Sequence, residues 1–123
     1  MNTELENETS FDDVVVLTPR GMILNRQMLI PFYRQLARCE KTGHTRVVVD
    51  LSGVKGFGAA LLGWLVTSRQ RLQKMGGEVV LAGLSEQGIR VLKMSKLSKI
   101  FRRFATVDQA VTAFGNCHLC TAA

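Results

Sequence analysis

Residues 46–75 constrain the fold more than any other part of the chain, because a buried strand there leads through a short turn into a helix. Residues 47–49 are an unbroken run of valines, and together with Leu51 they predict a strand that is buried on both faces. From Ala59 onward the apolar residues recur every three or four positions, which predicts an amphipathic helix up to about residue 75. The residues of its expected inward face are Leu61, Leu65, Ser68, Leu72 and Met75. A loop that joins a buried strand to a helix often carries function, so residues 52–60 are the first candidate site.

The rest of the chain alternates strands and helices in the same way. The expected elements, in chain order, are a strand at 14–17, a strand at 22–24, a helix at 26–41, a strand at 47–51, a helix at 59–75, a strand at 79–82, a helix at 86–94, a short strand within 97–104 and a helix at 107–114. We predict that the first two strands pair as a hairpin through a turn at residues 18–21. The alternation predicts an α/β fold with about four helices and a mixed, mostly parallel sheet that begins with this N-terminal β-hairpin.

Local signals set several of the expected helix ends. Pro31 is compatible with the first helix only if that helix begins near residue 28 or 29, since proline is tolerated in a first turn. We expect Gly76 to end the second helix as a left-handed cap and Ser85 to cap the N-terminus of the third helix. Gly115 is expected to end the last helix.

Length and composition are typical of one small domain in a reducing compartment. With 123 residues, 46% of them hydrophobic, the chain can form a core without metal or disulfide support. We divide it into a flexible acidic N-terminus at residues 1–10, a domain at 11–115 and a flexible C-terminal tail at 116–123. No apolar run approaches the roughly 20 residues of a membrane span, and the polar start is unlike a signal peptide, so we expect a cytoplasmic location. Three cysteines, an odd number, favour a reducing compartment over a disulfide framework.

The charge is distributed unevenly along the chain. Five of the ten acidic residues precede the first basic residue, Arg20. Between Arg69 and Arg103 there are nine basic residues against two acidic ones. These basic residues form either the solvated surface of helices or a contact surface for an acidic partner protein or a polyanion. We expect no nucleic acid partner, because no recognition motif and no interleaved aromatic residues accompany the charge.

Two short motifs carry a resemblance to a known family. Asp50-Leu51-Ser52-Gly53-Val54 is followed by a small-residue turn and then by Leu62-Gly63-Trp64-Leu65-Val66. Together with their order between strand and helix, these motifs resemble the STAS domain of anti-sigma factor antagonists, and the resemblance extends from about residue 14 to residue 114. It implies a single STAS-like domain that acts through protein–protein contact.

The resemblance also identifies a missing group. Family members usually carry Asp-Ser-Ser-Gly or Asp-Ser-Ala-Gly in the turn, and a partner kinase phosphorylates the first serine. The matching residues are Gly58, Ala59, Ala60 and Leu61, so Ala59 stands at the phosphorylation position without an oxygen that could accept a phosphoryl group. The family's usual switch cannot operate there. Two alternatives follow: a constitutive partner binder, or a domain that has changed its partner.

The resemblance implies a partner-binding surface at the same turn. Its expected residues are Ser52, Lys55, Gly56, Phe57, Gly58, Ala59 and Ala60. Phe57 makes the turn more apolar than the family pattern, and it belongs either to an exposed contact patch with the first helical turn or to the core. The expected partner is an anti-sigma factor or a related ATP-binding, kinase-like protein, with a homodimer as a further option.

Signals for other chemistry are weak. Cys117-His118-Leu119-Cys120 has the spacing of half a zinc or redox site, but no second pair accompanies it, so we predict no metal. Asp50 is expected to fix the turn by accepting backbone N–H bonds rather than to act as a catalytic carboxylate. The sequence has no GxGxxG or P-loop pattern, so we predict no cofactor and no enzymatic activity.

We therefore expect a non-catalytic regulator of transcription that works by partner switching without phosphorylation at Ala59. Two alternatives stay open. A cytoplasmic STAS subunit of a membrane transporter would contact the membrane only indirectly, through its partner, and would use the basic residues between Arg69 and Arg103. A STAS module could instead bind a nucleotide or another small ligand at the carboxyl edge of the sheet.

Overall fold

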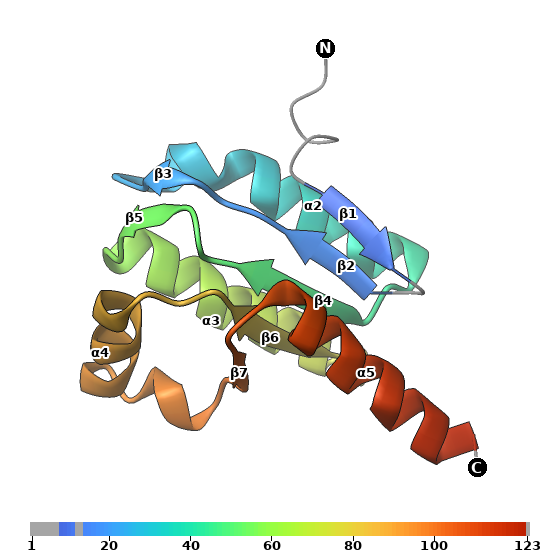
Figure 1. Cartoon of the computed structure of the whole chain (residues 1–123). Helices are drawn as coiled ribbons and strands as arrows, with labels where there is room; N and C mark the ends of the chain where they lie inside the picture. The colour runs from blue at the N-terminus through green and yellow to red at the C-terminus, as the bar shows by residue number, and fades with distance from the viewer. Residues whose placement is uncertain (1–7, 12–13, 123) are drawn as a thin grey trace.

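The computed structural model describes residues 8–11 and 14–122, and the side chains of residues 14–114. Strands and helices alternate along the chain, as Figure 1 shows. In chain order they are β1 (Glu8–Phe11), β2 (Val14–Leu17), β3 (Gly21–Met22), the 3-10 helix η1 (Arg26–Leu29), α2 (Ile30–Thr42), β4 (Arg46–Asp50), β5 (Val54–Gly56), α3 (Ala59–Gln73), β6 (Glu78–Ala82), α4 (Glu86–Met94), the 3-10 helix η2 (Leu97–Lys99), β7 (Arg103–Phe104) and α5 (Val107–Ala122).

Five strands form the main sheet in the spatial order β1, β2, β4, β6, β7. β1 and β2 are antiparallel, whereas the pairs β2–β4, β4–β6 and β6–β7 are parallel. In the centre of the sheet Val47 of β4 lies between Val15 of β2 and Val79 of β6. Such β-branched residues suit a pleated sheet that is covered on both faces. The predicted α/β fold with a mixed, mostly parallel sheet is confirmed.

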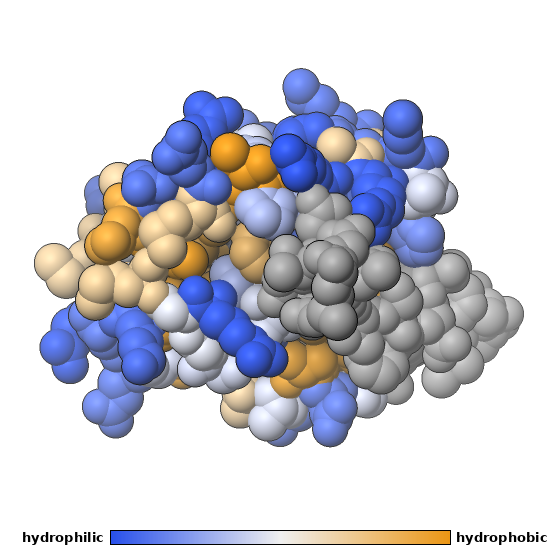
Figure 2. Space-filling view, turned by 90° about the horizontal axis from the view of Figure 1, so that it is seen from above, coloured by the Kyte–Doolittle hydropathy of each residue, from blue (hydrophilic) through white to orange (hydrophobic). Residues whose placement is uncertain are grey.

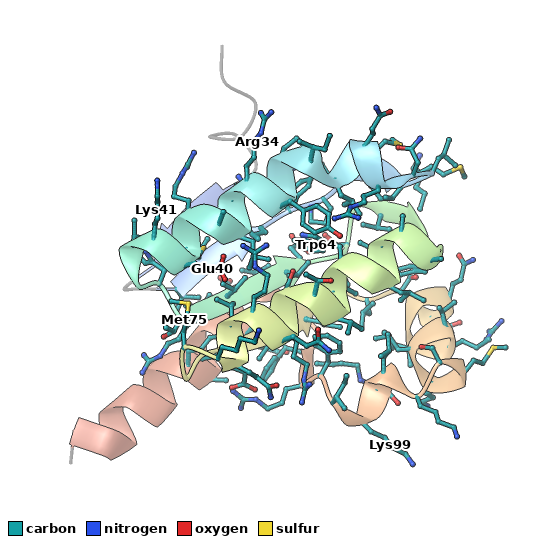
Figure 3. The ribbon with its side chains drawn as sticks, turned by 180° about the vertical axis from the view of Figure 1, so that it is seen from behind. Arg34, Glu40, Lys41, Trp64, Met75 and Lys99 are labelled. Atoms are coloured by element: carbon teal, nitrogen blue, oxygen red, sulfur yellow. The ribbon has the colours of Figure 1, made fainter. Side chains whose placement is uncertain are left out.

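Helices cover both faces of the main sheet. α2 and α3 lie next to each other on one face, and α5 lies on the other (Figures 1 and 3). Val47 and Val49 belong to the hydrophobic core under α2 and α3, whereas Val48 belongs to the core under α5. All three valines are completely buried. The prediction of a strand that is buried on both faces is confirmed.

α3 supplies much of the core between the sheet and α2. The predicted inward residues Leu61, Leu65, Ser68 and Leu72 are buried, and Met75 packs against the same core. Trp64 is also completely buried and lies between the two helices, where its ring meets the edge of Phe32 at a centroid distance of 5.9 Å (Figure 3). The Ser68 hydroxyl donates a hydrogen bond to the Trp64 carbonyl oxygen over 2.7 Å, so the buried hydroxyl is satisfied.

Most of the predicted helix ends are confirmed. The Ser85 hydroxyl accepts a hydrogen bond from the Gly88 N–H over 3.1 Å and caps α4, and Gly76 after α3 has the expected left-handed backbone with a φ of 76°. Pro31 lies in the first turn of α2, after η1. Gly115 is the exception, because α5 continues to Ala122. A single glycine costs a helix only about 1 kcal/mol, and no proline follows it.

The N-terminal hairpin is present, but its strands differ from the predicted pair. β2 pairs with β1, with Val14 opposite Phe11, and not with residues 22–24. That prediction was wrong because the residue before a proline prefers an extended backbone, so Thr18 and Pro19 carry the chain onward without a reversal (Figure 1). β3 then pairs in parallel with β5 in a separate two-stranded sheet.

The predicted domain boundaries do not coincide with element ends. The N-terminal boundary at residue 10 falls inside β1, and the C-terminal boundary at residue 115 falls inside α5. Residues 1–7 lie outside the described residues. The flexibility of residues 116–123 stays a prediction.

The predicted short strand within residues 97–104 is confirmed only for Arg103–Phe104, which form β7. Phe101 is buried in the core under α2 and α3, whereas Phe104 packs against the core under α5. Ile100 is 40% exposed. Phe101 and Phe104 therefore contribute to two different cores, and Ile100 lies at the surface.

We expect Leu65→Ala to lower the free energy of unfolding by about 2–5 kcal/mol, because the truncation leaves a cavity in the core under α3. Leu24→Ala is the matched control, since Leu24 is 71% exposed and its truncation should change stability by less than about 0.5 kcal/mol. Urea unfolding followed by circular dichroism measures both values. Equal losses for the two variants would contradict the described core.

Candidate functional site

The loop between β4 and α3 leaves the main sheet through a turn that Asp50 fixes. The Ser52 N–H donates a hydrogen bond to Asp50 Oδ1 over 3.0 Å, and the Val54 N–H donates to the Leu51 carbonyl oxygen over 3.1 Å. A carboxylate that accepts a backbone N–H two residues further on is an Asx turn. The predicted structural role of Asp50 is confirmed.

The middle of the loop is a strand rather than a free turn. β5 pairs in parallel with β3, and the Gly21 N–H donates to the Gly53 carbonyl oxygen over 2.8 Å. The loop is therefore joined by backbone hydrogen bonds to the segment that follows β2. This pairing, which the sequence did not reveal, places residues 21–24 next to the candidate site.

The candidate residues follow one another along this loop and the first turn of α3. We refer to them as the loop face, which consists of Ser52, Lys55, Gly56, Phe57, Gly58, Ala59 and Ala60. Its exposed members are Ser52, Lys55, Gly58 and Ala59. The others are partly buried. Most of the loop face is therefore accessible to a partner.

Phe57 is half-buried, and its ring packs against α4. A Cβ atom added at Gly88 of α4 would lie 2.7 Å from Phe57 Cζ and 2.8 Å from a methyl group of Leu84. Glycine at position 88 therefore gives the ring the room that it occupies. Phe57 joins the loop face to α4 and contributes only part of its surface to any exposed patch.

The N-terminus of α3 has no side-chain cap. Gly58 is the N-cap residue with an extended backbone, and the first turn contains no acidic residue. The first N–H groups of a helix lack partners within the helix, and the helix dipole adds partial positive charge there. The Ala59 side chain is exposed at the first position of the helix. An acidic side chain or a phosphate at this position would be stabilised by the same field.

Four exposed apolar side chains lie within residues 22–30, the segment that pairs with the loop face through β3. We refer to them as the apolar patch: Met22 (56% exposed), Leu24 (71%), Met28 (43%) and Ile30 (41%). Met22 pairs with Gly56 of the loop face, and a Cβ atom at Gly56 would lie 3.9 Å from Met22 Cγ. Figure 2 shows apolar side chains gathered at the β3 end of the molecule, on the left of that view.

The sequence contained a signal for the apolar patch that the hairpin prediction obscured. Ile23 is buried while Met22 and Leu24 are exposed, which is the alternation expected of an edge segment with one covered side. The predicted hairpin paired residues 22–24 with β2 and therefore placed them inside the main sheet. Their exposure follows only from the pairing of β3 with β5.

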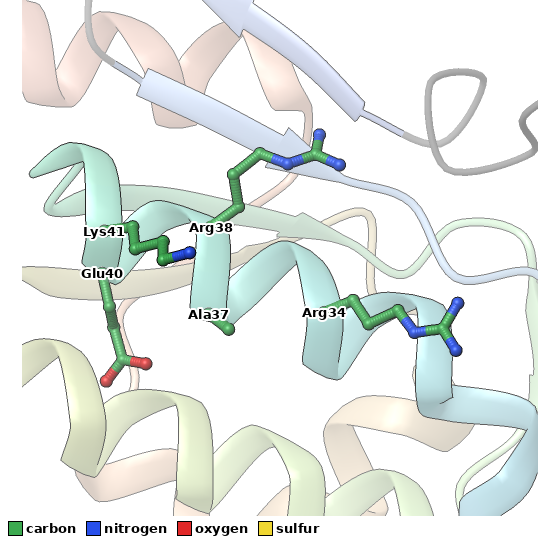
Figure 4. Close-up of a pocket in the computed structure, with 5 residues that line it drawn as sticks. All are labelled: Arg34, Ala37, Arg38, Glu40 and Lys41. Carbon is green, nitrogen blue, oxygen red and sulfur yellow. The ribbon is translucent and has the colours of Figure 1, made fainter.

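A shallow hollow of about 520 Å³ lies on α2, away from the loop face, and is lined by Arg34, Ala37, Arg38, Glu40 and Lys41 (Figure 4). Glu40 points away from the arginines of the hollow toward α3, where it forms an ion pair with Arg71 (Figure 4). Arg34 and Arg38 both have interaction partners. The hollow is not at the carboxyl edge of the sheet, where a ligand-binding STAS module was expected to hold its ligand.

The described residues contain no cluster of three or more His, Cys, Asp or Glu side chains that could hold a metal ion. The backbone of residues 117–120 belongs to α5 and does not follow it, so the predicted position of this motif after the last helix was wrong. Its side chains lie outside the described ones. Among the described helices, none combines the length and the apolar character needed to cross a membrane.

The contact between Phe57 and α4 can be tested with two glycines that both lie inside helices. Gly63→Ala on α3 should stabilise the protein by up to about 1 kcal/mol, because no atom lies within 4 Å of the added methyl group. Gly88→Ala should destabilise it by about 1–3 kcal/mol, because the methyl group displaces the Phe57 ring. Thermal unfolding measures both, and stabilisation by Gly88→Ala would contradict this packing.

The match to a family model and the likeness to solved structures agree with this geometry. The model of the STAS domain matches residues 9–110. A protein from Thermotoga maritima described as an anti-sigma factor antagonist is 25% identical with a TM-score of 0.77, over 86% of this chain and 91% of that chain. An anti-sigma factor antagonist from Mycobacterium paratuberculosis is 26% identical with a TM-score of 0.67, over 86% and 89%.

A third solved structure shares the fold at lower identity. It is the phosphorylated form of SpoIIAA, a Bacillus cell fate determinant, which is 17% identical with a TM-score of 0.70, over 87% of this chain and 96% of that chain. The family match covers most of the chain, including the main sheet, the loop face and α4. The chain therefore belongs to the STAS domain family.

Proposed function

We propose that this protein is a non-catalytic interaction module that binds an anti-sigma factor, or a related ATP-binding, kinase-like protein, in a partner-switching pathway of transcription. The binding surface in this proposal is the loop face together with the apolar patch. The observation that carries it is the exposed Ala59 at the uncapped N-terminus of α3, beside the four exposed apolar side chains. We expect the protein to act in the cytoplasm.

The apolar patch supports a protein partner rather than a small ligand. Large contiguous apolar surfaces on soluble domains commonly mark interaction sites. Methionine is enriched at interfaces, and its flexible, polarizable side chain adapts to different partners. Leu24, the most exposed member, projects 71% of its surface to solvent and is the natural anchor.

The absence of a hydroxyl at Ala59 supports binding that is not switched by phosphorylation. A phosphate at the first position of a helix adds about two negative charges at the centre of a contact surface. None of the nearby hydroxyls is an obvious replacement: Ser68 is buried within α3, Thr67 is half-buried within the same helix, and Ser52 lies at the Asp50 turn, outside the helix. In this proposal the loop face stays in its unmodified form, so the protein is a constitutive binder.

Ala59→Ser should convert the protein into a switch, because it restores an oxygen at the helix N-terminus. With the anti-sigma factor encoded nearest to this gene and ATP, the variant should gain one phosphate by mass spectrometry and lose affinity by about tenfold or more in calorimetry. Ala59→Asp should bind more weakly without ATP. Ala37→Asp on α2 is the matched control, since Ala37 is exposed and lies outside the loop face.

Three results would contradict this proposal. Phosphate on the wild-type loop face after incubation with the kinase-like partner would show that Ala59 does not disable the switch. Undiminished binding by Ala59→Asp would show that the partner contacts another surface. Binding lost equally in Ala37→Asp would mean that added negative charge alone weakens the complex.

Leu24→Ser should weaken binding of the same partner by about tenfold or more, because it removes the most exposed apolar anchor of the patch. Stability should stay unchanged, since the side chain is mostly in solvent. Calorimetric affinity and urea unfolding measure the two effects separately. If the protein is also a homodimer through this patch, light scattering should show that Leu24→Ser is monomeric. Full affinity in this variant would exclude the apolar patch from the contact.

A further inference from the structure

We propose that α4 and η2 carry a second docking surface, separate from the loop face, whose occupant is an acidic surface of a protein partner. We refer to it as the α4 face, and its members are Arg90, Lys93, Met94, Lys96 and Lys99. All five side chains are exposed, and Met94 is 79% exposed. Figure 3 shows Lys99 extending away from the body of the molecule.

Among the described residues, basic side chains outnumber acidic ones around the α4 face, and Glu86 lies one helical turn before Arg90. Glu86 is the only acidic residue between Gly83 and Arg103. The described ion pairs join Arg71 to Glu40 and Arg102 to Glu78, so they use none of the four basic residues of this face. Four cations around one exposed methionine are complementary to a patch that has carboxylates around an apolar centre.

Lys96 gives independent support, because its backbone is in an unfavourable conformation. Its φ is 64°, and it is the only residue other than glycine with a positive φ among the described residues. Lys96 is the residue after the C-cap of α4, where glycine is preferred for this conformation. A lysine at this position costs stability, and such strain is often found where a side chain is needed for function.

Neighbouring contacts hold the α4 face in place. The Ser95 hydroxyl donates to the carbonyl oxygen of Val91 over 2.9 Å and closes the end of α4. Arg69 of α3 donates from Nε to the Ile100 carbonyl oxygen over 3.3 Å and fixes the end of η2. Leu92 and Phe101 anchor the same segment in the core. A surface fixed in this way needs little ordering when a partner binds.

The buried side of α4 argues against a membrane as the occupant. An interfacial helix inserts its apolar face into the lipid, but Leu92 of α4 is buried in the protein, and Met94 is the only exposed apolar side chain of this helix. A nucleic acid is also disfavoured, because the α4 face has no aromatic side chain on which a base could stack. An acidic protein surface fits both the charge and the exposed methionine.

The test uses the full chain and a labelled synthetic helical peptide that carries glutamates at i and i+4 around a leucine stripe. Lys93→Glu with Lys96→Glu should weaken its binding by about tenfold or more in fluorescence anisotropy. Lys41→Glu with Lys74→Glu is the matched control, since it changes the net charge equally at two exposed lysines elsewhere. Raising the salt from about 0.05 M to about 0.3 M should weaken wild-type binding.

A second variant separates binding from stability. Lys96→Gly should raise the Tm by about 3 °C or more, because glycine tolerates the left-handed backbone, and should weaken peptide binding in the same sample. If Lys96 does not contact the peptide, Lys96→Gly should raise the Tm and leave peptide binding unchanged. That result would overturn the proposed role of Lys96. Ala59→Asp should leave peptide binding unchanged, so a failure of this proposal is distinguishable from a failure of the loop face.

Three further results would overturn the proposal. The first is equal loss of binding in the control pair, which would mean that net charge alone attracts the peptide. The second is tighter binding to vesicles of phosphatidylglycerol through the same lysines. The third is tighter binding to a DNA duplex through them. The proposal would be supported if peptide binding depends on Lys93 and Lys96 and if the protein binds the vesicles and the DNA duplex less tightly than the peptide.

Discussion

The completely buried valine run of β4 is the constraint on which the rest of the structure depends. Val47 and Val49 face the core under α2 and α3, while Val48 faces the core under α5, so this one strand ties two helical layers to the sheet. β4 lies between β2 and β6, so both of its edges are paired and both of its faces are covered. The parallel pairing on both sides then requires crossover connections, which α2 and α3 provide.

The position of the loop face follows from that arrangement. Because β4 is parallel to its neighbours, its carboxyl end lies at the edge where the chain leaves toward α3, and the Asp50 turn starts there. β5 and β3 pair beyond this edge and bring Met22 of the apolar patch beside Gly56 of the loop face. β6 ends at the same edge and continues into α4, against which Phe57 packs. The loop face and the α4 face therefore depend on different strands.

Electrostatics distinguishes the two surfaces. The loop face contains an uncapped helix N-terminus with Ala59 exposed at its first position. The α4 face is strongly basic and includes a lysine held in a costly backbone conformation. A protein with both surfaces can keep one partner bound through apolar contact while it attracts an acidic protein through charge. The STAS fold supplies the scaffold on which both proposed surfaces lie.

The sequence by itself determined the features that depend on neighbours along the chain. The valine run of β4, the helical spacing after Ala59 and the Ser85 cap each follow from residues a few positions apart, and each was predicted correctly. Tertiary structure decided which segments pair: Thr18 and Pro19 look like a turn in isolation, but the hydrogen bond from Gly21 to Gly53 spans more than thirty residues. The exposure of Leu24 and the packing of Phe57 against Gly88 follow from those distant pairings. Local periodicity reports which side of an element is apolar, whereas only the three-dimensional arrangement decides what covers that side.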